Sequence, residues 1–222
     1  EWRGVLRLIR SFAPVMFSIF RRNKYPLIDL SGIGVDMHSH LLPGIDDGSP
    51  DTETSLALIQ GLREMGYSRF IATPHVLWDL YRNDDTSIEG ALRDLQAALV
   101  SADQSAPMSA AAEYMIDDHF AQMVAEKAPF RCLSGKLLLV EFSFVSLPFE
   151  WKKIFFDLQM LGYQPVLAHP ERYTYLAGET HIFQEIADMG ILLQVNINSL
   201  TGYYGKLSYN LAMGMIKQKI VS

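Results

Sequence analysis

Short runs rich in β-branched and aromatic residues alternate with longer amphipathic stretches along most of the chain. The runs predict strands at 34–38, 70–73, 108–112, 137–142, 165–168 and 191–197. The stretches predict helices at about 50–66, 87–101, 117–126, 149–161, 180–189 and 207–217, the first opening with Ser49 as its cap and Pro50 at the first helical position. Strands that alternate with helices favour parallel pairing with right-handed crossovers, so the predicted fold class is α/β.

A basic amphipathic segment precedes this pattern. Apolar residues recur at helical spacing over residues 1–24, with Pro14 between them and six Lys or Arg side chains against Glu1. One interpretation is a helix that contacts a membrane surface, but a helix of this kind more often packs on its own domain. We therefore expect an N-terminal segment over residues 1–30 and one catalytic domain over residues 31–222, since a 222-residue chain can bury a single core.

Charge and cysteine content narrow the class of protein. The net charge is −6, and the acidic excess lies beyond the basic segment, which argues against nucleic-acid binding through a broad basic surface. No apolar run approaches the length of a membrane span. The single cysteine, Cys132, cannot form an internal disulfide and lacks the downstream Arg of thiol-dependent tyrosine phosphatases. We expect a cytoplasmic protein without a cysteine nucleophile.

Histidines and glutamates gather at the ends of the predicted strands. His38 and His40 bracket Ser39, so strand alternation points both imidazoles to the same side. From His40 onward, ligand-type residues recur about one βα unit apart, at His75, Glu113, Glu141 and His169. In a closed parallel barrel the carboxyl ends of all strands open on one face, where such side chains converge. Imidazoles and carboxylates without a thiolate indicate a site for more than one ion and suit Mn, Fe or Zn.

The segments that carry these residues resemble the metal-binding motifs of the polymerase and histidinol phosphatase (PHP) family. They are DMHSHLLPGIDDG (36–48), ATPH (72–75), AAEY (111–114), VEFS (140–143) and AHPERY (168–173). The motif HPERY, followed by QVNINSLTGYYG (194–205), is similar to the motifs of the capsule-associated tyrosine phosphatases of this family rather than to those of histidinol phosphatases.

The resemblance implies a distorted, TIM-like (β/α)7 barrel with up to three divalent metal ions, manganese being the metal that the family suggests. One ion would be held by His38, His40 and Glu113, a second by Glu113, Glu141 and His169, and a third by Asp47 and His75. The family places an Asp-x-His step on a seventh strand after the last predicted helix. We therefore expect the native chain to continue past Ser222, and the seventh strand to be missing here.

The same comparison gives roles to residues around the ligands. Arg172 would grip the substrate phosphate, as the catalytic and substrate-binding residue. Asp46 would support the loop or a ligand, and Asp36 would orient the histidine pair. The residues themselves suggest ordinary structural roles for others. Glu171 is expected in a local ion pair, and Asn196 and Asn198 in a turn, although they could also line the mouth of the site; His119 and His181, inside predicted helices, are expected to be solvated.

The expected activity is hydrolysis of phosphotyrosine on a protein, such as a bacterial tyrosine kinase that controls exopolysaccharide export. Divalent ions would lower the pKa of a bound water, and the resulting hydroxide would attack phosphorus. Two alternatives remain open. One is a phosphoesterase for a small molecule, like histidinol phosphatase, and the other is an inactive, metal-poor regulatory module.

Overall fold

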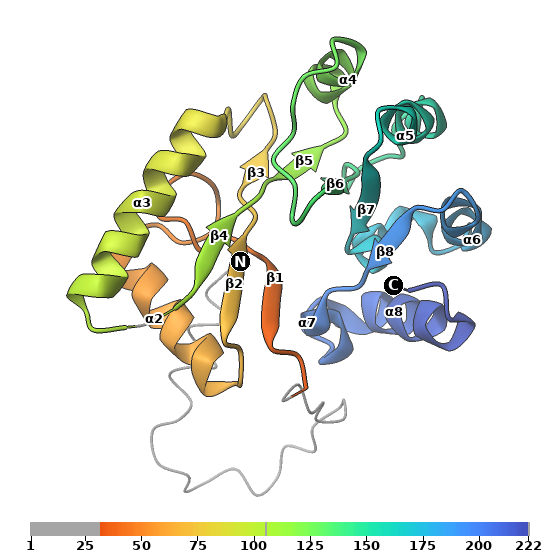
Figure 1. The fold of residues 1–222 in the computed structure, drawn as a ribbon. Coiled ribbons are helices and arrows are strands. Elements are labelled where there is room, and N and C mark those ends of the chain that lie inside the picture. The colour runs from red at the N-terminus through yellow and green to blue at the C-terminus, as the bar shows by residue number, and fades with distance from the viewer. Residues whose placement is uncertain (1–31, 105, 222) are drawn as a thin grey trace, which may run out of the picture. The chain divides into compact units, whose positions relative to one another are not determined.

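The computed structural model describes residues 32–104 and 106–221, which form an α/β protein with two parallel sheets (Figure 1). The chain divides into two compact units. The first contains the described residues up to Pro74 together with those of Asn83–Ala110, and the second contains His75–Arg82 and the chain from Ala111 onward. The predicted N-terminal segment lies outside the described residues, so its role stays a prediction, as does the expectation of one catalytic domain.

The first unit is built on a three-stranded sheet. Its strands are β1 (Val35–Ser39), β2 (Arg69–Ala72) and β4 (Met108–Ala110), paired in parallel in the order β1-β2-β4. Helices α2 (Thr52–Glu64) and α3 (Asp85–Ser101) lie side by side, and α3 packs on β4 (Figure 1). Both helices turn an apolar stripe inward, as their periodicity predicted. The buried side chains include Leu58, Ile59, Phe70, Ile88, Leu92, Leu95 and Leu99.

Helix α2 begins at Thr52, not at the predicted Pro50. Its cap is Asp51, whose carboxylate accepts the Thr54 N–H at 2.7 Å. Ser49 is fully buried instead; its hydroxyl donates to the Asp51 carbonyl at 2.9 Å and accepts from the Ser55 hydroxyl at 2.8 Å. The prediction of Ser49 as the cap was wrong, because a hydrogen bond from the first turns of the helix draws this hydroxyl into the interior.

The second unit is built on a five-stranded parallel sheet in the order β3-β5-β6-β7-β8. The strands are β3 (His75–Val76), β5 (Glu113–Met115), β6 (Leu137–Glu141), β7 (Gln164–Ala168) and β8 (Leu192–Gln194). The last four residues of both β6 and β7 are buried, which is typical of central parallel strands covered on both faces.

Helices and short 3₁₀ turns connect these strands. They are α4 (Asp118–Ala125), α5 (Trp151–Met160), η1 (Pro170–Arg172), η2 (Thr174–Leu176), α6 (His181–Asp188), α7 (Ile197–Leu200) and α8 (Gly205–Gln218). Helix α5 packs on β7 and α6 on β8 (Figure 1). The predicted stripe of α5 is buried at Ile154, Phe155 and Leu158.

Two predicted strands differ from the structure. The run 108–112 contributes β4 to one sheet and leads, through the fully buried Ala111 and Ala112, into β5 of the other sheet. The run 191–197 stops at Gln194, because the Asn196 side chain accepts the Asn198 N–H at 2.9 Å and caps α7.

The α/β class with parallel strands is confirmed. Neither sheet closes on itself among the described residues, so the closed (β/α)7 barrel stays a prediction. No helix in that part of the chain is both long enough and apolar enough to span a membrane.

Candidate metal centre

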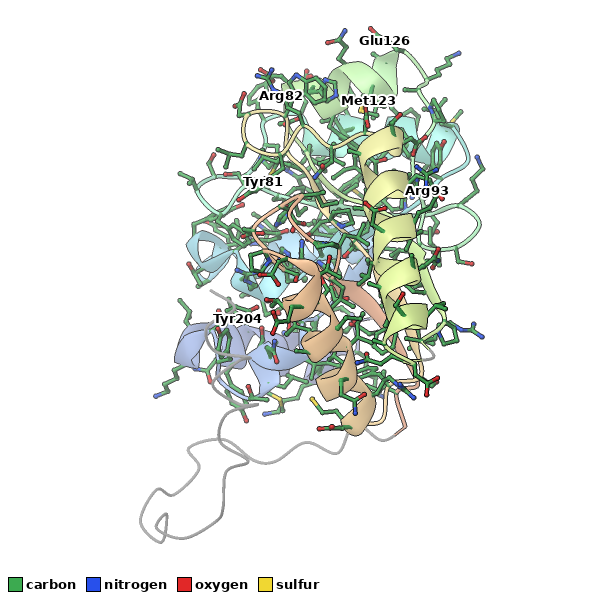
Figure 2. The ribbon with its side chains drawn as sticks, turned by 90° about the vertical axis from the view of Figure 1, so that its left-hand side faces the viewer. Tyr81, Arg82, Arg93, Met123, Glu126 and Tyr204 are labelled. Atoms are coloured by element: carbon green, nitrogen blue, oxygen red, sulfur yellow. The ribbon has the colours of Figure 1, made fainter. Side chains whose placement is uncertain are left out.

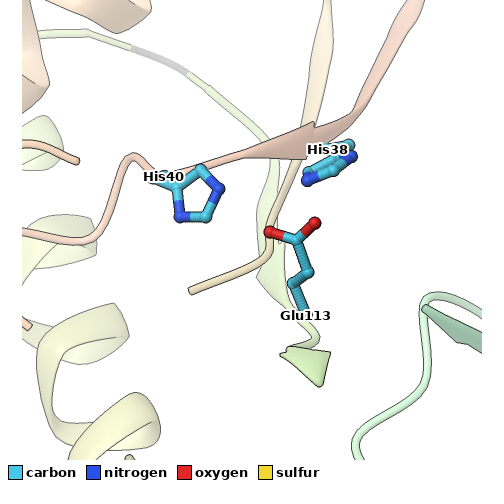
Figure 3. A group of neighbouring side chains, drawn as sticks. All are labelled: His38, His40 and Glu113. Carbon is cyan, nitrogen blue, oxygen red and sulfur yellow. The ribbon is translucent and has the colours of Figure 1, made fainter. Parts of the chain in front are cut away.

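Strand β1 delivers two histidines at its carboxyl end. His38 lies within the strand and His40 follows it, with the buried Ser39 between them (Figure 3). Their ring centroids are 5.8 Å apart. The Asp36 carboxylate accepts a hydrogen bond from the backbone N–H of His38 at 3.3 Å. Asp36 thus contacts the histidine pair through the backbone of His38. Burial raises the pKa of Asp36, and a hydrogen bond with the Ser39 side chain opposes this effect.

The loop after β1 fixes the ring of His40. Its Nδ1 lies 2.7 Å from Asp46 Oδ2, and the other oxygen of Asp46 accepts the Gly48 N–H at 2.9 Å. A Cβ atom on Gly48 would lie 2.3 Å from His40 Cβ, so only glycine fits against this histidine. Asp46 therefore supports His40, as the sequence predicted, while Asp47 is exposed beside it. A carboxylate on one ring nitrogen orients the other toward a metal.

The second unit gathers two imidazoles and two carboxylates. Its donor atoms lie close together: His75 Nδ1 is 2.8 Å from Glu141 Oε1 and 3.3 Å from Glu113 Oε2. His169 Nε2 is 2.8 Å from Glu113 Oε1 and 3.7 Å from Glu141 Oε2. One ligand atom from each of His75, Glu113 and Glu141 lies within 4.8 Å of the others.

The strands place two of these four residues differently from the prediction. Glu141 ends β6 and His169 follows β7, as expected, but His75 begins β3 and Glu113 begins β5 (Figure 3 shows Glu113). The prediction that Glu113 closes a strand was wrong. His75 and Glu113 are direct partners in the parallel pair β3-β5, which explains their close approach across 38 positions of sequence.

The buried negative charge of these two carboxylates favours a bound cation. Both Glu113 and Glu141 have 0% exposure, and their oxygens lie close to the same two imidazoles. Transfer of a carboxylate out of water costs several kcal/mol for each ion. A divalent ion between two carboxylates and two imidazoles removes this cost, and the nitrogen and oxygen donors suit Mn, Fe or Zn. The residues therefore fit a metal.

The turn after β7 carries Arg172. His169 adopts a left-handed φ of 33°, and η1 starts directly after it. The guanidinium carbon of Arg172 lies 4.5 Å from the ring centroid of Phe144 and 4.3 Å from that of Tyr204, which precedes α8 (Tyr204 is labelled in Figure 2).

Glu171 accepts hydrogen bonds from a later segment of the chain. It is fully buried, and its Oε1 accepts the Asn196 N–H at 3.0 Å and the Ser199 hydroxyl at 2.6 Å. Burial raises the pKa of Glu171, while the bond from Ser199 opposes the rise. These two partners lie 25 and 28 residues away, and the charge of the adjacent Arg172 also lowers the pKa of Glu171, so the expected local ion pair stays a prediction. This carboxylate ties η1 to the start of α7.

Tyr173 ties two strand ends of the site together. Its hydroxyl accepts the Phe142 N–H and donates to the Ala168 carbonyl, each at 2.9 Å. Phe142 directly follows Glu141, and Ala168 directly precedes His169. No sequence signal indicated this role, because a tyrosine at such a position is usually predicted to be part of the core. His119 is half-buried, and its ring stacks on that of Trp78 with the centroids 3.8 Å apart; His181 is exposed, as expected.

A family model described as capsular polysaccharide synthesis, CpsB/CapC, matches residues 34–222. This chain belongs to the CpsB/CapC family. The resemblance to capsule-associated tyrosine phosphatases is thus confirmed.

Curated relatives of the CpsB/CapC family align with most of the chain. The tyrosine-protein phosphatase YwqE of Bacillus subtilis is 28% identical over 187 residues, which are 84% of this chain and 74% of YwqE. The putative tyrosine-protein phosphatase CapC of Staphylococcus aureus is 27% identical, over 84% of this chain and 73% of CapC. The tyrosine-protein phosphatase CpsB of Streptococcus pneumoniae is 28% identical, over 73% of this chain and 67% of CpsB.

A solved structure is also similar. It comes from work on YwqE and the pneumococcal CpsB, described as unique metal-dependent tyrosine phosphatases. The match has a TM-score of 0.78 and 28% identity, and covers 84% of this chain and 76% of the solved chain.

Proposed function

We propose that this CpsB/CapC chain is a metal-dependent protein-tyrosine phosphatase that acts in surface polysaccharide synthesis. The observation that carries the proposal is the pair of fully buried carboxylates, Glu113 and Glu141, each facing two imidazoles. Buried acids in this arrangement are typical of a metal site rather than of a structural ion pair. The names of the relatives support phosphotyrosine as the substrate class.

The proposed ligands are those of the sequence motifs. Within the second unit, Glu113, Glu141 and His169 hold one ion, and His75 lies beside them. The remaining ligands, His38, His40 and Asp47, belong to the first unit, and their use together with the second group rests on the motif pattern. Up to three ions, manganese as the metal, the TIM-like barrel, a tyrosine kinase as substrate and a cytoplasmic location all belong to this proposal.

The described side chains account for binding and orientation. Bound divalent ions supply an acidified water and positive charge against the phosphate. Arg172 binds the phosphate oxygens through charge-assisted hydrogen bonds. Asp46 holds His40 in one ring orientation, and Tyr173 fixes the backbone next to Glu141 and His169. Glu171 holds the turn that carries Arg172.

Chelation and metal return test the proposal. Protein treated with EDTA and dialysed should lose hydrolysis of a phosphotyrosyl peptide, and added Mn²⁺ should restore it. Glu141→Gln should lower metal content and activity together, whereas Glu179→Gln, which changes an exposed carboxylate, should leave both at the level of the unmodified chain. Undiminished hydrolysis by the metal-free protein would refute the proposal. Faster turnover of histidinol phosphate than of the peptide would favour the small-molecule alternative.

A further inference from the structure

The ring of Phe144 bridges two parts of the candidate site. It stacks on the His169 ring at 5.5 Å with an interplanar angle of 24°, and it lies 4.5 Å from the guanidinium carbon of Arg172. Phe144 is nevertheless 44% exposed. One phenylalanine thus contacts a proposed metal ligand and the proposed phosphate-binding residue, and still presents apolar surface to solvent.

A second ring contacts Arg172 from a distant segment. Tyr204 lies 4.3 Å from the guanidinium carbon and packs edge-on against Tyr203, with centroids 5.0 Å apart. The hydrogen bonds of Glu171 to Asn196 and Ser199 hold α7 near η1, and α7 leads directly into the Tyr203–Tyr204 pair. Packing of a guanidinium over a ring face consumes no N–H donor, so Arg172 can be fixed by the rings and still bind phosphate in a bidentate manner.

We infer that Phe144 and Tyr204 form an aromatic clamp that fixes Arg172 and packs on the phenyl ring of the substrate, so that the site selects aryl over alkyl phosphate monoesters. This inference rests on the proposed phosphatase function. In phosphotyrosine a single oxygen joins the ring to phosphorus. A phosphate held by Arg172 therefore brings the substrate ring within reach of the rings that contact this guanidinium. A phosphoserine side chain offers only a methylene group, which cannot make an aromatic pair.

The variant Phe144→Leu tests the clamp, because leucine keeps an apolar side chain and removes the ring. Two peptides that differ only in phosphotyrosine or phosphoserine would be compared by kcat/KM. Benzylphosphonate and ethylphosphonate would be compared as competitive inhibitors, which gives a binding readout without turnover. We expect both aryl-to-alkyl ratios to fall roughly tenfold in the variant, as the loss of one aromatic pair predicts. Metal content should stay at that of the unmodified chain.

Two further variants complete the design. Tyr204→Leu should lower the same ratios, because it removes the other ring of the clamp. Phe149→Leu is the matched control: Phe149 is 99% exposed and five residues beyond Phe144, and its loss should leave the ratios unchanged.

The outcomes separate the clamp from the proposed function. Ratios that stay constant in both Phe144→Leu and Tyr204→Leu would overturn the clamp alone, as would an unmodified chain that hydrolyses both peptides equally well. Loss of metal in Phe144→Leu would also overturn it and make the ring a support for His169. An unmodified, metal-loaded chain that hydrolyses neither peptide would overturn the proposed function and the clamp with it.

Discussion

Removal of the Tyr173 hydroxyl is predicted to destabilise the second unit and weaken its metal site. Tyr173 is completely buried, and its hydroxyl makes two hydrogen bonds to the backbone of neighbouring strands. Burial, and next the nearby Glu141, raise the pKa of Tyr173 well above its ordinary value, so the hydroxyl remains a donor near neutral pH. The substitution Tyr173→Phe keeps the ring and deletes only this bridge.

The magnitude follows from the groups left behind. Phe142 has 0% exposure, so its N–H has no access to water once the hydroxyl is gone. An unsatisfied buried donor costs about 1–3 kcal/mol, which gives an expected loss of about 2 kcal/mol in the free energy of unfolding. Since Glu141 and His169 adjoin the two bridged backbone groups, metal affinity should fall as well.

Tyr175→Phe is the matched control for this prediction. The Tyr175 hydroxyl is also buried, but it has no hydrogen-bond partner within the described residues. Desolvation raises the pKa of Tyr175 to about 12. Urea unfolding should show a lower free energy of unfolding for Tyr173→Phe and an unchanged or higher one for Tyr175→Phe, since the second substitution removes a buried hydroxyl without a partner in the described residues. Elemental analysis should show less metal in the first variant only. Equal unfolding free energies and equal metal content in the two variants would refute the bridging role.

Three further substitutions have definite expected results. Arg172→Ala should lower kcat/KM for a phosphotyrosyl peptide by roughly 10- to 100-fold with metal content retained, and a parallel loss of metal would make Arg172 structural. Gly48→Ala should displace His40 and lower metal content, which unchanged elemental analysis would contradict. Cys132→Ser should retain full activity, and alkylation of Cys132 below pH 9 should be slow because burial raises the pKa of its thiol; loss of activity would instead indicate a thiol mechanism.

The helices could be predicted from the sequence because their signal is local. Helix α5 was expected over 149–161 and spans Trp151–Met160, and its buried stripe follows from a 3.6-residue period within one segment. The three-residue strands β4 and β5 carry no comparable signal, since alternation needs more positions than they contain. The separation of the run 108–112 into two sheets depends on pairing with distant strands, which no local pattern encodes.

The candidate ligands could also be predicted from the sequence, for a related reason. A histidine or glutamate next to an apolar strand is a polar residue in an apolar segment. His38, His75 and Glu141 can therefore be recognised as candidate ligands from the sequence alone. Glu171 also follows an apolar strand closely, but the sequence does not show which groups it accepts hydrogen bonds from. Its chemistry as a buried acceptor is set by Asn196 and Ser199, which fold back from a later segment.

Aromatic residues show why the rest of the site needed the structure. Phe144 and Tyr173 both follow β6 or β7 closely, and either ring would read as core from sequence. Tyr173 has 0% exposure and two hydrogen bonds from its hydroxyl, whereas Phe144 is 44% exposed and lies against Arg172. The first ring can therefore act only through the backbone that it bridges, while the second can meet a substrate. Tyr173→Phe is therefore predicted to change stability and metal content, and Phe144→Leu to change substrate preference. This difference follows from the exposure and contacts of the two rings rather than from residue type.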